Sequence, residues 1–79
     1  MRLSELKVGQ SGTIVSLAMK GATRHRFLEM GFVRGERIQV KRVAPLGDPV
    51  EYFIKGYHLA LRQAEAAQIE VTLLGATHD

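Results

Sequence analysis

Cysteine is absent from this chain of 79 residues, which removes several kinds of chemistry at once. Without thiols the chain has no disulfide framework, no thiolate metal site and no thiol nucleophile. Proline is scarce as well, with two residues. Hydrophobic residues make up 46% of the chain and charged residues 24%, whereas a disordered chain is poor in apolar residues and strongly charged. The composition therefore predicts a folded protein.

Long hydrophobic runs are also missing. The longest uncharged stretch, residues 8–19, is interrupted by glycine, serine and glutamine, and a membrane-spanning helix needs about 20 apolar residues. Arg2, Glu5 and Lys7 lie near the start with no apolar run behind them, so no signal peptide is visible. We expect the protein to be cytoplasmic.

The length allows one small domain. A chain this short buries only about 60% of the surface that its unfolded form exposes, so two separate cores would not fit. We expect residues 1–74 to form the domain and residues 75–79 to fray at the C-terminus. No Gly-rich phosphate loop and no nucleophile elbow or triad signature is present. The sequence therefore predicts a protein that is not an enzyme and has no catalytic residues.

Short runs of alternating apolar and polar residues indicate strands. Five such runs are present, at residues 12–17, 38–43, 50–55, 57–61 and 69–73. The apolar phase slips by one residue between Val40 and Val43, which predicts a β-bulge. Residues 44–49 contain both prolines and predict a turn. The fold class is mainly all-β, a small closed barrel of about five strands with one short α-helix after the first strand.

That helix is predicted over residues 22–30. Phe27 and Met30 fall on one side of it with Leu28 beside them, so we expect all three to face the core. Gly31 is the expected left-handed C-cap of the helix.

Two further features accompany the helical pattern. Phe32 follows the C-cap glycine and can fold back onto the last turn as a hydrophobic latch. Residues 62–68 also have helix-forming composition, but they cover only about two turns.

Positive charge is concentrated in one block. The chain carries a net charge of +3, but residues 20–42 alone hold seven cationic side chains against two carboxylates, a net charge of +5. Such a block favours an acidic partner surface, a nucleic acid or anionic lipid headgroups, or it is a solvated face with no ligand.

Histidine and glutamate offer weak candidates for a metal site. His25 and Glu29 lie one helical turn apart, His58 stands on a predicted strand, and His78 lies in the tail. A stable divalent-metal site needs three or four ligands on a rigid frame, which this spacing does not supply. We therefore predict no cofactor and find no support in the ligand spacing for bound Fe(II) or another divalent metal.

Nucleic acid is the rival ligand, because small barrels bind single strands with a basic groove and exposed aromatic rings. Phe53 lies opposite the apolar face of its strand and beside Glu51, which makes a poor stacking platform. The other four rings fit better as core or latch residues, namely Phe27, Phe32, Tyr52 and Tyr57. We therefore expect no nucleic acid.

Several sequence blocks stand out when they are taken together. They are LSEL (3–6) followed by Gly9, Gly12 and Ile14, RFLEMGF (26–32) followed by Gly35, APLGDP (44–49), GYHLALR (56–62) and EA (65–66). In this order they resemble the FeoA family, ferrous iron transport protein A, over roughly residues 3–72. Phe27 stands where an aliphatic residue is usual, and residues 18–20 are less glycine-rich than in many members.

The resemblance implies an SH3-like barrel and a role in bacterial ferrous iron uptake. The implied partner is FeoB, a membrane GTPase and permease, which the protein would modulate through protein–protein contacts and reach the membrane only indirectly. The alternatives are a metal-responsive SH3-like module of the iron-dependent repressor type and a nucleic-acid-binding small barrel. Because Met1 directly precedes the domain, a stand-alone protein is favoured over the repressor module. Self-association stays open.

Two groups of residues are the candidates for partner binding. A shallow groove between loops would hold hydrophobic anchors that carry most of the binding energy, and the candidates there are Leu46, Gly47, Asp48 and Pro49. Cationic side chains would steer association toward an acidic patch or the membrane surface, and the candidates are Lys20, Arg24, Arg26 and Arg34.

Overall fold

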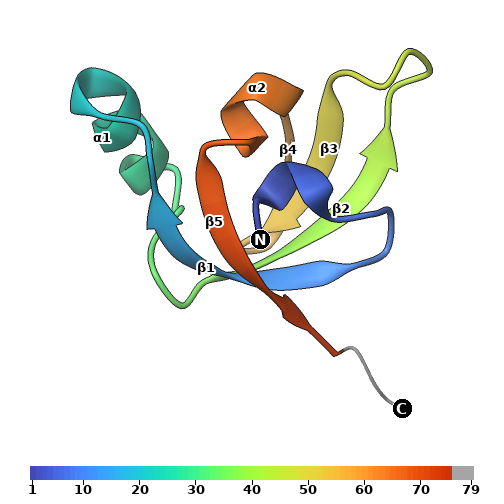
Figure 1. The fold of residues 1–79 in the computed structure, drawn as a ribbon, viewed down its shortest axis with the longest axis horizontal. Coiled ribbons are helices and arrows are strands. Elements are labelled where there is room, and N and C mark those ends of the chain that lie inside the picture. Colours follow the sequence, from blue (N-terminus) through green and yellow to red (C-terminus); the bar gives the residue numbers. More distant parts are fainter. Residues whose placement is uncertain (76–79) are drawn as a thin grey trace.

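Five strands, two short α-helices and one 3-10 turn make up the part of the chain that the computed structural model describes, residues 1–75 (Figure 1). In chain order the elements are η1 (Leu3–Glu5), β1 (Ser11–Leu17), α1 (Gly21–Glu29), β2 (Arg37–Val43), β3 (Val50–Ile54), β4 (Tyr57–Leu61), α2 (Gln63–Ala66) and β5 (Ile69–Leu74). No helix among them has the length and apolar character to cross a membrane. The predicted fraying of residues 75–79 concerns a tail that, apart from Gly75, lies outside the described residues.

The five strands form one antiparallel sheet in the order β4-β3-β2-β1-β5. The sheet is strongly curved, and η1 and α2 pack together near β5 at its open side (Figure 1). Five antiparallel strands with a helix after the first strand confirm the predicted fold class. Closure by pairing of β4 with β5 is not found within residues 1–75, because these strands are the two ends of the sheet.

The inner face of the sheet carries the core. In β3, Val50, Tyr52 and Ile54 are buried, whereas Glu51 and Phe53 between them face outward and are only partly covered. The other elements fill the same core, and their largest fully buried side chains are Leu3, Ile14, Phe27, Phe32, Ile38, Val40, Ile69 and Val71. Each large apolar side chain contributes about 1.5–3 kcal/mol when it is fully buried.

The predicted irregularity in β2 is present. The pairing of β2 with β3 shifts between Val40 and Arg42, where the apolar phase slips in the sequence. A second shift, between Ile14 and Ser16 in the pairing of β1 with β5, was not predicted. Both irregularities locally increase the twist and bending that let so small a sheet wrap around its core.

Gly31 terminates helix α1 in a left-handed conformation, as predicted. Gly31 has a φ of +103°, and the Gly31 and Phe32 amides donate to the carbonyls of Leu28 and Phe27 at 3.1 and 3.0 Å. These are the two hydrogen bonds of a Schellman motif. The rings of Phe27 and Phe32 meet edge to face with centroids 5.2 Å apart, so the predicted latch is confirmed.

The prediction that Leu28 faces the core is wrong. Leu28 is exposed, and Met30 is only partly buried. The reason is that α1 touches the sheet along a narrow stripe in which Phe27 alone is buried.

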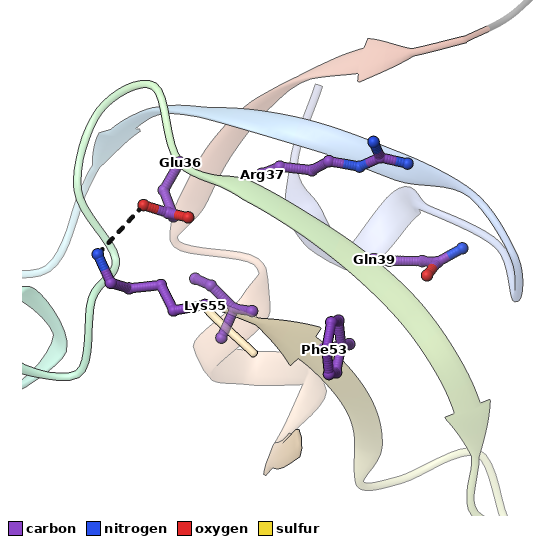
Figure 2. A pocket seen from close by; sticks show the side chains of 6 residues that line it. Glu36, Arg37, Gln39, Phe53 and Lys55 are labelled. Atoms are coloured by element: carbon purple, nitrogen blue, oxygen red, sulfur yellow. Dashed lines mark hydrogen bonds and ion pairs between the residues drawn. The ribbon is translucent and has the colours of Figure 1, made fainter. Parts of the chain in front are cut away.

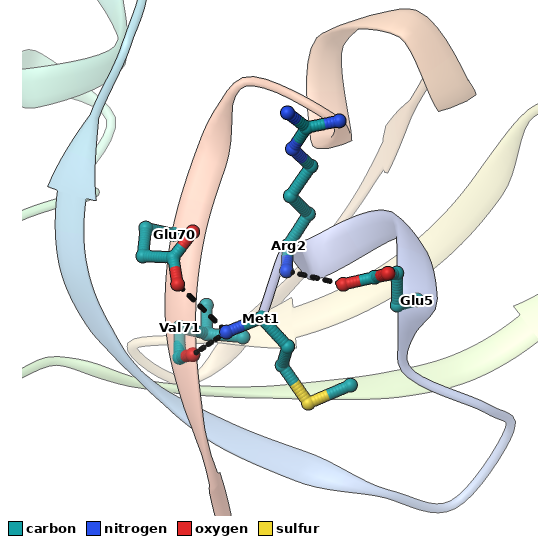
Figure 3. Close-up of polar contacts among 5 residues, drawn as sticks. All are labelled: Met1, Arg2, Glu5, Glu70 and Val71. Atoms are coloured by element: carbon teal, nitrogen blue, oxygen red, sulfur yellow. Dashed lines mark hydrogen bonds and ion pairs between the residues drawn. The ribbon is translucent and has the colours of Figure 1, made fainter.

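The N-terminal segment lies beside β5 (Figure 3). The α-amine of Met1 donates to the Glu70 carboxylate at 2.7 Å and to the Val71 carbonyl at 3.0 Å. The Val71 amide in turn donates to the Met1 carbonyl at 2.7 Å. The Arg2 amide donates to the Glu5 carboxylate at 2.7 Å, which fixes the start of η1. These residues cover the outer edge of β5 around Glu70 and Val71.

A two-residue turn joins β3 and β4. Ile54 pairs with Tyr57, and φ is positive at both turn residues, 50° at Lys55 and 83° at Gly56. Positive φ at both positions is typical of a type I′ turn, whose twist matches that of the flanking strands. The exposed Tyr57 ring does not join the core, but its hydroxyl donates to the Met30 carbonyl and so holds the end of α1 as a latch.

Replacing Gly31 by alanine should destabilise the fold. The left-handed backbone costs about 1–2 kcal/mol for a residue with a Cβ, and the methyl group would displace the Lys55 side chain, which pairs with Glu36. Urea unfolding measures the loss. Gly9 has a φ of +90° with open space around it, so Gly9→Ala is the control that reports the backbone cost alone. Wild-type stability in Gly31→Ala would contradict the proposed role of the helix end.

Candidate functional site

The β2–β3 loop (residues 44–49) is the first candidate site, and its backbone is held by internal hydrogen bonds. The Ala44 amide donates to the Pro49 carbonyl at 3.0 Å, which closes the loop at its base. The Gly47 amide donates to the Ala44 carbonyl at 2.7 Å, which makes the tight turn at its tip. The two prolines further restrict the backbone, so the loop has little freedom to rearrange.

Helix α2 holds this loop from the side. The Gln63 amide at the start of α2 donates to Asp48 Oδ1 at 2.9 Å, and the Gln63 side chain donates to the Gly47 carbonyl at 3.2 Å. Asp48 therefore accepts from one of the amides that a helix start leaves unpaired. The predicted site residues Gly47 and Asp48 thus position the loop.

The loop presents one apolar side chain to solvent. Leu46 is 97% exposed, more than any other large hydrophobic side chain of residues 1–75. An exposed leucine forgoes the stabilisation of about 1.5–3 kcal/mol that burial supplies. Because the backbone around Leu46 is already fixed, a partner that covers it removes little conformational freedom. A fixed loop with an exposed leucine is suited to docking.

A shallow groove of about 420 Å³ lies beside the loop. Its apolar lining comes from the loop and from the neighbouring strands, namely Val43, Ala44, Pro45, Pro49 and Ala60. Arg42 and Glu51 also border it and form an ion pair with 3.0 Å between Nη2 and Oε1. The groove can therefore take an apolar side chain beside a charged rim.

Asp48 also affects a tyrosine of the core. Tyr52 is 1% exposed, and burial together with the negative charge of Asp48 raises its pKa to about 12. The fold therefore favours the neutral form of the Tyr52 phenol.

The four cationic candidates lie on or beside α1, and two of them have structural contacts. Arg24 Nη1 donates to the Leu17 carbonyl at 2.9 Å, which ties α1 to the end of β1. Arg26 lies 3.7 Å from the Glu65 carboxylate of α2. Arg24 and Arg26 are therefore partly engaged in contacts within the domain, whereas the sequence suggests both of them for steering a partner.

The other two cations flank the helix. Lys20 is the N-cap of α1, Arg34 follows its C-terminal end, and both side chains are exposed. We call α1 together with Lys20, Arg24, Arg26 and Arg34 the cationic end. Helix α1 and the β2–β3 loop lie on opposite sides of the molecule (Figure 1). The structure therefore does not bring the two predicted groups of partner-binding residues together into one patch.

The three metal-site candidates are not gathered in one place. His25 Nε2 lies 3.2 Å from Glu29 Oε2, with both side chains largely exposed on α1. His58 stands on β4, and its Nδ1 lies 3.0 Å from Glu51 Oε2. Within residues 1–75 no group of three or more His, Cys, Asp or Glu side chains converges as metal ligands do. The described residues therefore do not fit a divalent metal held by several protein ligands.

A second feature, on the outer face of the sheet, was missed by the sequence patterns. The Phe53 ring packs against His58 with centroids 4.8 Å apart, and Lys41 Nζ lies 5.8 Å from the Phe53 centroid. The hydrogen bond from Arg42 keeps the pKa of Glu51 below its ordinary value. The cross-strand pairs Phe53–His58 and Arg42–Glu51 would have revealed this cluster if the register had been known.

A groove of about 360 Å³ opens beside Phe53 on this face (Figure 2). Lys55 pairs with Glu36 at one end of it, with 3.4 Å between Nζ and Oε1, while Phe53 and Gln39 stand at the other. The Phe53 ring, on which a nucleic-acid base would stack, already packs against His58 and lies close to Lys41.

Comparison with known proteins covers nearly the whole chain. The FeoA domain family matches residues 1–73. The chain belongs to the FeoA family. A FeoA domain is a small non-catalytic accessory domain involved in ferrous iron transport.

One relative of this FeoA domain is a fusion protein. The Fe(2+) transport protein A/Fe(2+) transporter FeoB fusion protein of Porphyromonas gingivalis is 50% identical over 76 residues, which is 96% of this chain. The chain spans only 9% of that relative's length. A FeoA domain and FeoB therefore share one polypeptide in that organism.

Solved FeoA structures have the same fold. FeoA from Chlorobium tepidum is 42% identical with a TM-score of 0.90, over 99% of this chain and 74% of that one. FeoA from Stenotrophomonas maltophilia, a prokaryotic SH3 domain protein complexed with zinc, is 32% identical with a TM-score of 0.78, over 90% of this chain and 88% of that one. The predicted SH3-like barrel is therefore confirmed.

Alkaline titration should reveal the buried tyrosine. The pKa of Tyr52 is about 12 in the folded chain and about 10 when the chain is unfolded, so between these values only the unfolded chain loses the proton. The contribution of Tyr52 to stability is intact below pH ~10 and has fallen by about 2 kcal/mol at pH ~12. In Tyr57→Phe, Tyr52 is the remaining tyrosine and tyrosinate absorbance reports it alone. A midpoint near 10 in the folded protein would contradict the shift.

Proposed function

We propose that this FeoA domain is a cytosolic accessory protein of ferrous iron uptake that docks onto a FeoB-type membrane GTPase transporter and modulates it. The P. gingivalis fusion carries the proposal, since a domain 50% identical to this chain is joined there to FeoB. Covalent linkage keeps two modules at a high effective concentration. Such a permanent linkage is what we expect of two modules that act on each other.

The β2–β3 loop is the proposed docking site. Leu46 would be the central hydrophobic anchor, and the groove beside it would take an apolar side chain of the partner. Interfaces draw most of their binding energy from a few such anchors. The hydrogen bonds of Asp48 and Gly47 with α2 support this assignment, because they hold the loop in place before any partner arrives.

The cationic end around α1 has a separate role in this proposal. The longest extent of the molecule is 39 Å, whereas charges act over a Debye length of only about 8–10 Å at physiological salt. Because α1 and the β2–β3 loop lie on opposite sides of the molecule, the charges around α1 give little help to docking at the loop (Figure 1). We assign Lys20 and Arg34, with Arg24 and Arg26, to a second contact with an acidic surface of the transporter or of the membrane beside it.

Leu46→Glu should weaken binding to the purified cytosolic region of a FeoB-type transporter. A charged side chain cannot replace a buried hydrophobic anchor, and loss of such an anchor costs about 2 kcal/mol or more, or at least about 30-fold in Kd. Isothermal titration calorimetry measures the change. The unfolding free energy should stay within about 0.5 kcal/mol of wild type, because the side chain is exposed.

Val8→Glu is the matched control for that experiment. Val8 is also exposed and lies on the turn before β1, outside the β2–β3 loop. It should bind like wild type. Equal weakening of both variants would point to a general charge effect, and unchanged binding of Leu46→Glu would exclude the loop as the docking site.

A further inference from the structure

The two end strands of the sheet differ in what covers their free edges. The outer edge of β5 is covered at Glu70 and Val71 by the N-terminal segment, with hydrogen bonds in both directions between Met1 and Val71. No such cover is found for β4 among residues 1–75, because residues 57–61 make no backbone hydrogen bond beyond their pairing with β3. One edge of the sheet is therefore open.

The hairpin turn shows which backbone groups face this open edge. In a two-residue turn the flanking residues, Ile54 and Tyr57, form a hydrogen-bonded pair. Bonded and non-bonded pairs then alternate along an antiparallel ladder, so the N–H and C=O groups of His58 and Ala60 point away from β3. Both residues are exposed.

The open edge lacks the usual protection against strand pairing. Natural edge strands carry lysine, proline or a bulge, or they are covered by another segment. Strand β4 reads Tyr-His-Leu-Ala-Leu, with no proline and no lysine, and its register with β3 is regular. The edge is therefore competent to receive a further strand.

A second copy of this chain is a poor occupant of the edge. In an antiparallel pair of two β4 strands, the outward N–H and C=O groups of both copies are all hydrogen-bonded when His58 of one copy lies opposite Ala60 of the other. In that register Arg62 of each copy lies opposite Gly56 of the other, so that Arg62 and Lys55 fall one residue apart at both ends of the new pair. Like charges this close together repel each other, which disfavours the pair. The same two cations favour a strand with carboxylates at its ends.

The groove beside the β2–β3 loop indicates which type of residue the middle of the added strand would carry. Ala60 lines the groove together with Pro45 and Pro49, and its small side chain leaves room above it. A residue of an added strand opposite Ala60 would project its side chain on the same face, over the groove. An apolar residue fits this position.

We propose that the free edge of β4 binds an extended segment of the partner protein as a sixth strand of the sheet. The segment has an apolar residue opposite Ala60 and carboxylates near Lys55 and Arg62. Main-chain hydrogen bonds would supply affinity, and the groove would supply specificity. The inference rests on the proposed function, because the FeoB-type transporter is taken to supply the segment.

Two substitutions at Ala60 test the added strand. Ala60→Pro removes an outward N–H and leaves the bonds to β3 in place, as proline does on edge strands. Ala60→Lys keeps every backbone group and places a charge on the edge. Both should raise the Kd for the purified cytosolic region of a FeoB-type transporter at least about tenfold. Thr72→Lys, at an exposed position of the covered strand β5, is the control and should bind like wild type.

Amide hydrogen exchange gives a direct readout in the wild-type chain. On addition of the same cytosolic region, the amides of His58 and Ala60 should exchange at least about tenfold more slowly. The Leu59 amide, which faces its partner Tyr52 in β3, is the internal reference and should change little. Slower exchange at His58 and Ala60 identifies backbone pairing and not merely a nearby contact.

The outcomes separate this inference from the proposed function. If Leu46→Glu weakens binding while both Ala60 variants bind like wild type and the His58 amide stays unprotected, the sixth strand is excluded and loop docking stands. If the wild-type chain does not bind the transporter region, both fail. If protection and a doubled mass arise with the chain alone, the occupant is a second copy and the inference is overturned.

Discussion

Val50, Tyr52 and Ile54 form the inner face of β3, and they are covered by side chains from the neighbouring strands and from the segments that lie over the sheet. A domain of this length has one core, so these positions cannot be polar or empty without loss of the fold. Nearly every inward side chain is thereby committed to packing. Recognition is left to the outer face, the loops and the strand edges.

Local chemistry explains why much of the fold was predictable. The alternation along β3, the left-handed Gly31 and the phase slip after Val40 each depend on residues close together in the sequence. Such features are read from period, turn chemistry and φ preference without knowledge of the rest of the chain. The two prolines likewise indicated the β2–β3 loop, which is why this part of the candidate site was found from sequence.

Contacts between remote residues explain what was not predicted. The bond from Gln63 to Asp48 and the pairing of Met1 with Val71 join segments that no periodicity connects. The open edge of β4 follows from strand order, which the sequence does not contain. Leu28 was misplaced because its period fits a core position, whereas the docking of α1 leaves that side of the helix in solvent.

A chain of contacts links the cationic end to the β2–β3 loop. Arg26 of α1 meets Glu65 of α2, and the first residue of α2, Gln63, holds Asp48 of the loop. Exposed ion pairs contribute little stability on their own, but this one connects two helices that are each fastened elsewhere, α1 by the Tyr57 hydroxyl and α2 by the loop. The two ends are therefore joined by a continuous line of contacts. If they contact two surfaces of one transporter, as proposed, the effect of the domain depends on how far apart those surfaces lie in each state of the transporter.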